Sequence, residues 1–215
     1  MTSPAPIVIE AEVADSEHPF VLAGAQQLAE ALAAATGSEW PIQLRYREPG
    51  AAVASSMANS VVVLSLLPEV DRDEPFAETQ GRLAARLAAL VQGTAPVLIC
   101  TVFRHVAERR TAASAARLER IRRLDRLAAE LSADLGFGVV DIDRAFAHIG
   151  GRVLATDHRL NGRLAAEVGG HTLAWSLLSV GLDDIVPPEA QERAKAFLGP
   201  LREINSLVSR RLAAG

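Results

Sequence analysis

The chain has 215 residues, of which 49% are hydrophobic, so it is long enough to bury the core of one medium-sized domain. A formal net charge of −4 argues against a nucleic-acid-binding protein, which needs a surplus of basic side chains. The single cysteine, Cys100, excludes an intramolecular disulfide and a metal site built from several cysteines.

The first residues, MTSPAPIVIEAEV, contain neither a basic segment nor a long apolar run, so they do not resemble a secretory signal peptide. The longest apolar runs, such as VVVLSLL at 61–67, are far shorter than the roughly 20 residues that a transmembrane helix requires. We therefore expect a cytoplasmic protein that has no membrane partner.

Five short segments rich in apolar and β-branched residues predict strands. Segments 61–67 and 97–103 are almost continuously apolar, as expected for strands buried on both faces of a parallel sheet. Segment 42–47, IQLRYR, alternates apolar and polar residues and so suits an edge strand. In chain order the predicted strands are 7–13, 42–47, 61–67, 97–103 and 138–142.

Segments with a helical repeat of apolar residues separate these strands. The clearest is 111–135, where a stripe of leucines and one isoleucine lies opposite arginines and glutamates. Glycines follow several of these segments at positions typical of helix C-termini. The predicted helices are 21–35, 76–92, 111–135, 161–178, which the pair Gly169-Gly170 would kink or interrupt, and a tail from 188 to about 212, broken at Gly199-Pro200.

This alternation of strands and helices predicts a parallel sheet with right-handed crossovers and helices on both faces. We therefore predict an α/β protein, a three-layer α/β/α sandwich with a five-stranded, parallel, flavodoxin-like sheet. Residues 1–185 would form one domain and residues 186–215 a helical extension. Because apolar residues recur at helical spacing in the extension, it would pack on its own domain or on a second copy, as in a homodimer.

In such a fold, ligands bind beyond the C-terminal ends of the strands, which selects the stretches 14–20, 48–56, 68–74, 104–110 and 144–161. The first, beginning ADSEHPF, lacks the glycines of a nucleotide-binding loop. No histidine pair has zinc-site spacing, and the acidic segment PEVDRDE lacks the glycine of a calcium loop. The sequence therefore predicts no metal and no cofactor.

Ala14-Asp15-Ser16, directly after the first predicted strand, resembles the Gly-Asp-Ser motif of the SGNH, or GDSL, hydrolase family. The resemblance covers most of residues 5–180 as an order of elements. It implies a hydrolase that acts on a small acylated substrate, with Ser16 as the nucleophile and Asp15 among the substrate-binding residues. The backbone N–H groups of Ser16 and Gly50 would stabilise the oxyanion.

Two parts of the family pattern differ in this sequence. The segment SLLPEVD, after the third strand, lacks the family's asparagine, and Ser65 is the only neutral polar side chain nearby. The family also has Asp-x-x-His before its last helix. Here Asp157 matches the acid, Leu160 stands in the place of the histidine, and His158 follows the acid directly. The resemblance therefore assigns the base to His158 or His171, with Asp157 orienting it.

These residues also have purely structural interpretations. Asp15 and Ser16 are typical of a polar turn or a helix cap, and Asn161 of the N-cap of the helix that follows it. His158 would then be an exposed loop side chain. His171 would be a packing residue, because it lies about ten residues into the predicted helix, roughly 15 Å from the start of that helix.

Arg104 and His105, at the end of the fourth strand, would face the same edge of the sheet and bind an anionic group. Trp40 and Trp175 are more typical of core or interface anchors. Three functions remain open from the sequence. The chain is a divergent SGNH-like esterase or acyltransferase, a degenerate relative with a binding or assembly role, or an unrelated flavodoxin-like protein that binds a small anion or regulates another protein.

Overall fold

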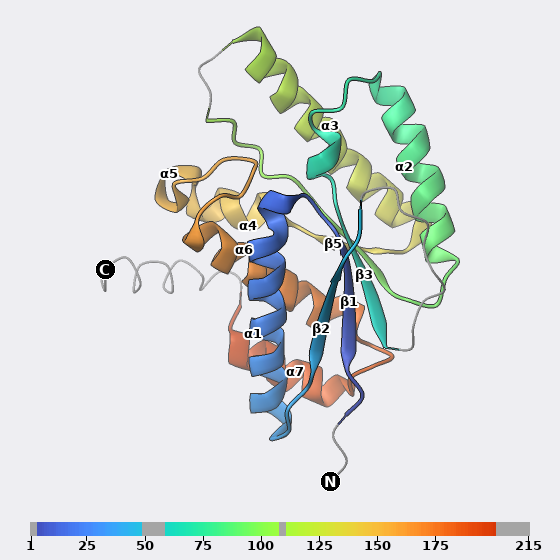
Figure 1. The fold of residues 1–215 in the computed structure, drawn as a ribbon, viewed down its shortest axis with the longest axis vertical. Coiled ribbons are helices and arrows are strands. Elements are labelled where there is room, and N and C mark those ends of the chain that lie inside the picture. Colours follow the sequence, from blue (N-terminus) through green and yellow to red (C-terminus); the bar gives the residue numbers. More distant parts are fainter. Residues whose placement is uncertain (1–3, 49–58, 108–110, 201–215) are drawn as a thin grey trace.

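A computed structural model describes residues 4–48, 59–107 and 111–200, and the predicted oxyanion residue Gly50 lies outside these ranges. Five strands form one parallel sheet in the order β2-β1-β3-β4-β5 (Figure 1). This is the strand order of a flavodoxin-like sheet, so the predicted fold class is confirmed. The strands are β1 (Ile7–Glu12), β2 (Ile42–Tyr46), β3 (Ser60–Ser65), β4 (Val97–Cys100) and β5 (Gly138–Val140).

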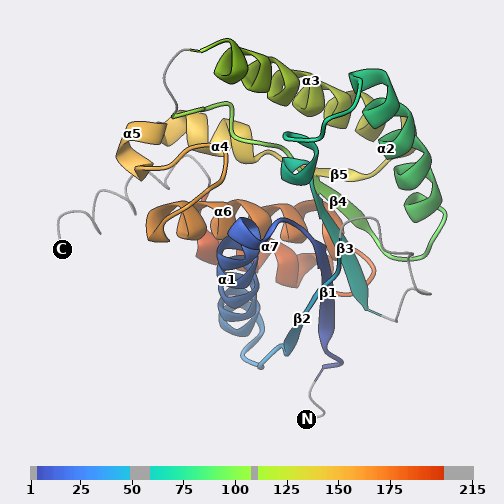
Figure 2. The same ribbon diagram turned by 45° about the horizontal axis from the view of Figure 1, so that its top comes forward.

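Helices cover both faces of the sheet and enclose two buried apolar clusters (Figures 1 and 2). One cluster lies under α2 (Phe76–Val91) and α3 (Ala112–Leu135). The other joins the sheet to the remaining helices, which are α1 (His18–Thr36), α4 (Ile142–Ile149), α5 (Gly151–Leu154), α6 (Arg163–Ser176) and α7 (Pro188–Leu198). None of the described helices is both long enough and apolar enough to cross a membrane.

The helical extension begins on its own domain. α7 packs along α1 and buries Ala190, Gln191 and Ala194. Residues 201–215, which hold most of the apolar repeat of the extension, lie outside the described ranges.

The predicted strand 138–142 ends at Val140, and much of the stretch 144–161, expected to be a loop, belongs to α4 and α5. The Asp141 side chain caps α4 by accepting a hydrogen bond from the backbone N–H of Arg144 at 3.0 Å. Ile142, Ala145 and Phe146 then point into the core from one face of a helix that is only eight residues long. So short a helix shows barely two turns of its apolar repeat, which explains why the pattern was not recognised.

The pair Gly169-Gly170 neither kinks nor interrupts α6, which runs unbroken into a π-helical turn at Leu177–Gly181. The two glycines instead allow α6 to approach α1 closely. A Cβ atom at Gly170 would lie 2.7 Å from the backbone nitrogen of Gly24, and one at Gly169 would lie 2.9 Å from the Cβ of Phe20. The glycines are therefore required by helix packing.

Gly170→Ala is expected to destabilise the protein by about 1–3 kcal/mol, because the added methyl group meets the backbone of α1, which must shift. Gly81, within α2, is the matched control, since a Cβ atom there meets nothing within 4 Å. Gly81→Ala should stabilise the protein by about 0.5–1 kcal/mol through helix propensity alone. Urea unfolding of both variants measures the difference, and equal effects would contradict the close approach.

Candidate active site

The chain turns sharply where β1 ends. A 3₁₀ turn at Asp15–Glu17 leads directly into α1, and Ser16 lies half-buried within it. The buried carboxylate of Glu17 accepts hydrogen bonds from the backbone N–H of Ala14 at 2.8 Å and from Oγ of Ser65 at 2.6 Å. Ser65 is the last residue of β3, so Glu17 ties the turn that carries Ser16 to the neighbouring strand.

The hydroxyl group of Ser65 both donates and accepts a hydrogen bond at this position. Its Oγ accepts a hydrogen bond from the backbone N–H of Leu67 at 3.0 Å while its own proton goes to Glu17. Because the hydroxyl proton of Ser65 is already donated to Glu17, Ser65 does not supply the oxyanion donor that the missing asparagine would provide.

Burial raises the pKa of Glu17 to about 7, against the opposing effect of the hydrogen bonds from Ser65 and Ala14. The thiol of Cys100 is buried, and its pKa is raised well above the usual value by that burial and by the charge of Glu17. Glu17 is a residue that the sequence reasoning did not single out. Its position three residues after Ala14 is the spacing of a helix-capping glutamate, which is the signal that would have found it.

His158 is buried, with 1% of its surface exposed, so the expectation of an exposed loop side chain is wrong. Its backbone N–H donates a hydrogen bond to the carbonyl of His105 at 2.8 Å, which fastens the loop before α6 to the segment that follows β4. Neither ring nitrogen of His158 has a hydrogen-bond partner in the described parts of the chain. Burial lowers the pKa of the ring, and the nearby Asp157 partly offsets this, so the imidazole is neutral near pH 7.

Asp157 and His158 are adjacent but do not form a hydrogen-bonded pair. The closest approach, between Oδ2 of Asp157 and Nδ1 of His158, is 3.8 Å. The Oδ1 atom of Asp157 instead accepts a hydrogen bond from the backbone N–H of Arg159 at 2.9 Å, which closes a tight turn. Gly162, and not Asn161, is the N-cap residue of α6, so the interpretation of Asn161 as the cap is wrong.

His171 lies in the middle of α6, eight residues after Arg163 and thus about 12 Å along the helix axis. It is 5% exposed, and its ring stacks nearly parallel to that of Trp175, with the centroids 6.5 Å apart. Burial lowers its pKa, while a hydrogen bond with the backbone of Gly199 acts in the opposite direction. These contacts agree with the packing interpretation of His171 and leave His158 as the stronger candidate for the base.

The structure does not join Ser16 to any of these groups directly. Among the described residues, no hydrogen bond links Ser16 to a histidine. Asp15 is fully exposed and lies 3.8 Å from His18, whose ring stacks on Tyr46. The side chain of Asp15, the first residue of the turn, therefore points to the surface.

Arg104 does not offer a free cation for an anionic ligand. Its Nε donates to Oδ2 of Asp143 at 2.7 Å, and its backbone N–H donates to Oδ1 of the same carboxylate at 2.8 Å. His105 packs against Gly151, where a Cβ atom would lie 2.9 Å from the His105 ring. These two residues thus attach α4 and α5 to the end of β4.

Another acid with a raised pKa, the half-buried Asp125 on α3, was also missed from the sequence. Asp125 accepts a hydrogen bond from the backbone N–H of Val102 at 2.8 Å, and its other oxygen has no partner among the described residues. Burial raises its pKa to about 7. No group of three or more histidine, cysteine, aspartate or glutamate side chains in the described ranges is arranged to hold a metal ion.

No protein-family model matches the sequence, and the search among curated proteins gave no significant match. Solved structures do match. LAE5, an α/β hydrolase enzyme from the metagenome of Lake Arreo, Spain, is 16% identical over 90% of this chain and 98% of its own, with a TM-score of 0.52. The chain shares the fold of that hydrolase.

Two further structures have somewhat lower similarity. A suspected SGNH hydrolase from Slackia heliotrinireducens is 13% identical over 82% of this chain and 100% of its own, with a TM-score of 0.49. A member of the lipolytic G-D-S-L family from Veillonella parvula DSM 2008 is 14% identical over 81% and 97%, with a TM-score of 0.47.

Proposed function

We propose that the chain is a divergent serine hydrolase of SGNH type, an esterase or acyltransferase that acts on a small acylated substrate. The observation that carries this proposal is that Ser16 and His158 lie at the same edge of the sheet. Ser16 lies four residues after the end of β1, and the backbone of His158 is bonded to that of His105, five residues after the end of β4. Only β3 separates these strands, so their ends are roughly 10 Å apart, a distance that two loops and a substrate can span.

The state of His158 suits a general base. A buried polar group without a partner costs about 1–3 kcal/mol, and both ring nitrogens of His158 are in this state among the described residues, whereas in His171 only Nε2 is. In the proposed reaction, Oγ of Ser16 attacks the acyl carbon while a ring nitrogen of His158 accepts the serine proton. His158 then returns this proton to the leaving alkoxide, and water or another acceptor releases the acyl group from Ser16.

The remaining groups have smaller roles in this proposal. The carboxylate of Asp157, 3.8 Å from His158, would stabilise the imidazolium by its charge without orienting the ring through a hydrogen bond. The backbone N–H of Ser16 would donate to the oxyanion. Because Ser65 is committed to Glu17, one donor is missing, and we expect a rate lower by on the order of a hundredfold than that of a complete site.

A catalytically degenerate protein with a binding or assembly role is the second candidate. It is favoured by the use of Asp157 in a local turn and by the lack of a hydrogen bond from Ser16 to a histidine in the described residues. Assembly as a homodimer through the C-terminal helices is the form we propose for that role. Sedimentation of the full chain as a dimer, without ester hydrolysis, is its expected signature.

A panel of nitrophenyl acetate and nitrophenyl butyrate distinguishes the two functions. The wild type should hydrolyse at least one ester faster than Ser16→Ala does. Ser179→Ala is the matched control, because Ser179 is exposed on the π-helical turn after α6 and, among the described residues, its side chain bonds only the carbonyl of Trp175. Equally slow hydrolysis by the wild type and Ser16→Ala would rule out the hydrolase and leave the binding role.

A further inference from the structure

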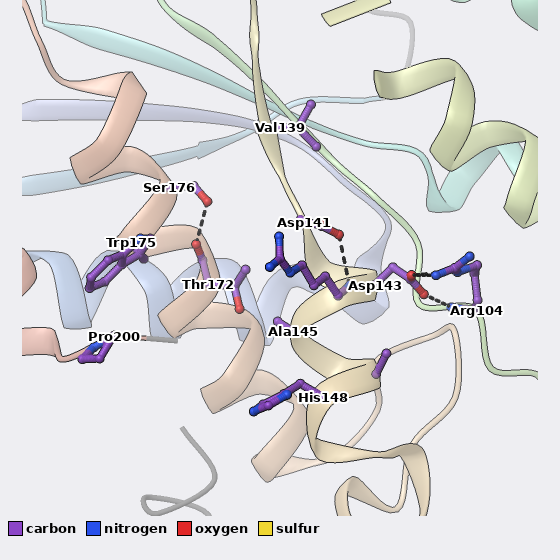
Figure 3. A pocket seen from close by; sticks show the side chains of 12 residues that line it. Arg104, Val139, Asp141, Asp143, Ala145, His148, Thr172, Trp175, Ser176 and Pro200 are labelled. Carbon is purple, nitrogen blue, oxygen red and sulfur yellow. Dashed lines mark hydrogen bonds and ion pairs between the residues drawn. The ribbon is translucent and has the colours of Figure 1, made fainter. Parts of the chain in front are cut away.

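A cleft of about 1010 Å³ lies between α4 and α6, beside the edge strand β5 (Figure 3). Its lining does not include Ser16, Asp157 or His158, so it is separate from the proposed active site. Small-molecule sites in proteins usually measure about 300–1,000 Å³, so the cleft has room for a complete small ligand.

One wall of the cleft supplies hydrogen-bond donors. Arg144 and His148 are four residues apart on α4 and therefore lie on the same face of that helix. Both are exposed, and among the described residues no carboxylate lies within ion-pair distance of the Arg144 guanidinium. Arg104, on the same cleft, differs because Asp143 neutralises it. Arg144 is thus the cation that remains available to a ligand.

The opposite wall, on α6, presents an aromatic face and hydrogen-bond acceptors (Figure 3). Trp175 is partly exposed, and the buried ring of His171 stacks parallel to it and supports it from within the helix layer. The hydroxyl groups of Thr172 and Ser176 donate their protons to carbonyls of α6, at 2.8 and 2.9 Å. Thr172 is buried, whereas the half-buried Ser176 keeps lone pairs on Oγ that can accept a hydrogen bond from a ligand.

We propose that this cleft binds a small planar aromatic carboxylate. The carboxylate pairs with the fork of N–H donors on Arg144, with His148 as a second donor. The aromatic ring lies against Trp175, where offset stacking adds to the burial of surface. A hydroxyl or amino substituent on the ring finds an acceptor on Ser176. The carboxylate of Asp141, at the start of α4, also lines the cleft and disfavours a second negative charge on the ligand.

Fluorescence of Trp175 reports binding directly. The chain has two tryptophans, and Trp40→Phe leaves Trp175 as the single reporter. The probe is 4-nitrobenzoate, whose nitro group quenches indole fluorescence, and the neutral comparison is 4-nitrobenzamide. We expect saturable quenching by the carboxylate at least about tenfold tighter than by the amide, as a charge-assisted hydrogen bond contributes about 1.5–3 kcal/mol.

Arg144→Gln, in the same background, should abolish this preference, and both probes should then bind with equal, weaker affinity. Arg126→Gln is the control, because Arg126 is also an exposed helix arginine but lies on α3, away from the cleft. An unchanged unfolding midpoint shows that both variants are folded. Quenching without saturation, equal affinity for both probes in the Trp40→Phe protein, or an unchanged preference in Arg144→Gln would each overturn the proposal. None of these outcomes depends on Ser16 being catalytic.

Discussion

Ser16→Ala and His158→Gln are each expected to lower kcat/KM for the best nitrophenyl ester by about a thousandfold or more, and the double variant should be no slower than either single variant. A nucleophile and its base act as one unit, so removing either one removes the whole contribution of the pair. Glutamine is chosen for His158 because it keeps a polar side chain in the buried site but cannot accept the proton.

The pH dependence provides an independent check on the same pair. Catalysis requires neutral His158, and burial lowers the pKa of this ring below its ordinary value of 6.5. The rate should therefore be constant near pH 7 and fall only as the pH drops through the lowered pKa. Losses from Ser16→Ala and His158→Gln that multiply in the double variant would show that the two residues do not act together.

The free energy of unfolding is expected to fall as the pH rises from about 4.5 to about 7, because of the buried carboxyl of Glu17. Its pKa rises from an ordinary 4.5 to about 7 in the folded protein, so between these values the folded state binds more protons than the unfolded state. The stabilisation present at low pH is therefore lost as the pH approaches 7. At about 1.4 kcal/mol for each pH unit, the loss is about 3 kcal/mol.

Glu17→Gln should remove this part of the pH dependence, because glutamine is neutral throughout. Its Oε1 can accept from the backbone N–H of Ala14, while its Nε2 donates to Oγ of Ser65, which reverses the direction of that hydrogen bond. The measurement is urea unfolding of the wild type and the variant at pH 5 and pH 8. Asp125→Asn is the matched control, since Asp125 has the same direction of pKa change but lies on α3. Asp125→Asn should remove only the contribution of Asp125 to the pH dependence of stability and leave the contribution of Glu17 unchanged. Parallel stability curves for the wild type and Glu17→Gln would contradict the burial of a charged carboxyl at this turn.

The link between Glu17 and the proposed chemistry is geometric. Glu17 follows Ser16 in the chain and bonds the residue two before Ser16, so its two hydrogen bonds define the path of the turn that presents the serine. Glu17→Gln keeps the bond from Ala14, reverses that with Ser65, and is expected to change kcat/KM far less than Ser16→Ala does.

Local signals in the sequence were sufficient for the fold class. β3 and β4 were recognisable because strands buried on both faces are continuously apolar, a property of each segment alone. The ends of α1 and α3 were recognisable because Gly37 and Gly136 take left-handed φ values of 71° and 80°, which glycine adopts without strain. The alternation of these segments then left a parallel sheet as the simplest arrangement.

The properties of the candidate site came from contacts between distant segments. The sequence located Ser16 after β1 and a histidine before α6. The backbone of His158 is bonded to His105, 53 residues earlier. Burial raises the pKa of Glu17, and the opposing hydrogen bond comes from Ser65, 48 residues later. The role of Gly170 likewise depends on α1, about 146 residues earlier, and not on its own helix. Hydrophobic periodicity is a local property of the chain, whereas desolvation and close helix packing arise only when remote segments meet, and so the tertiary structure was required to establish them.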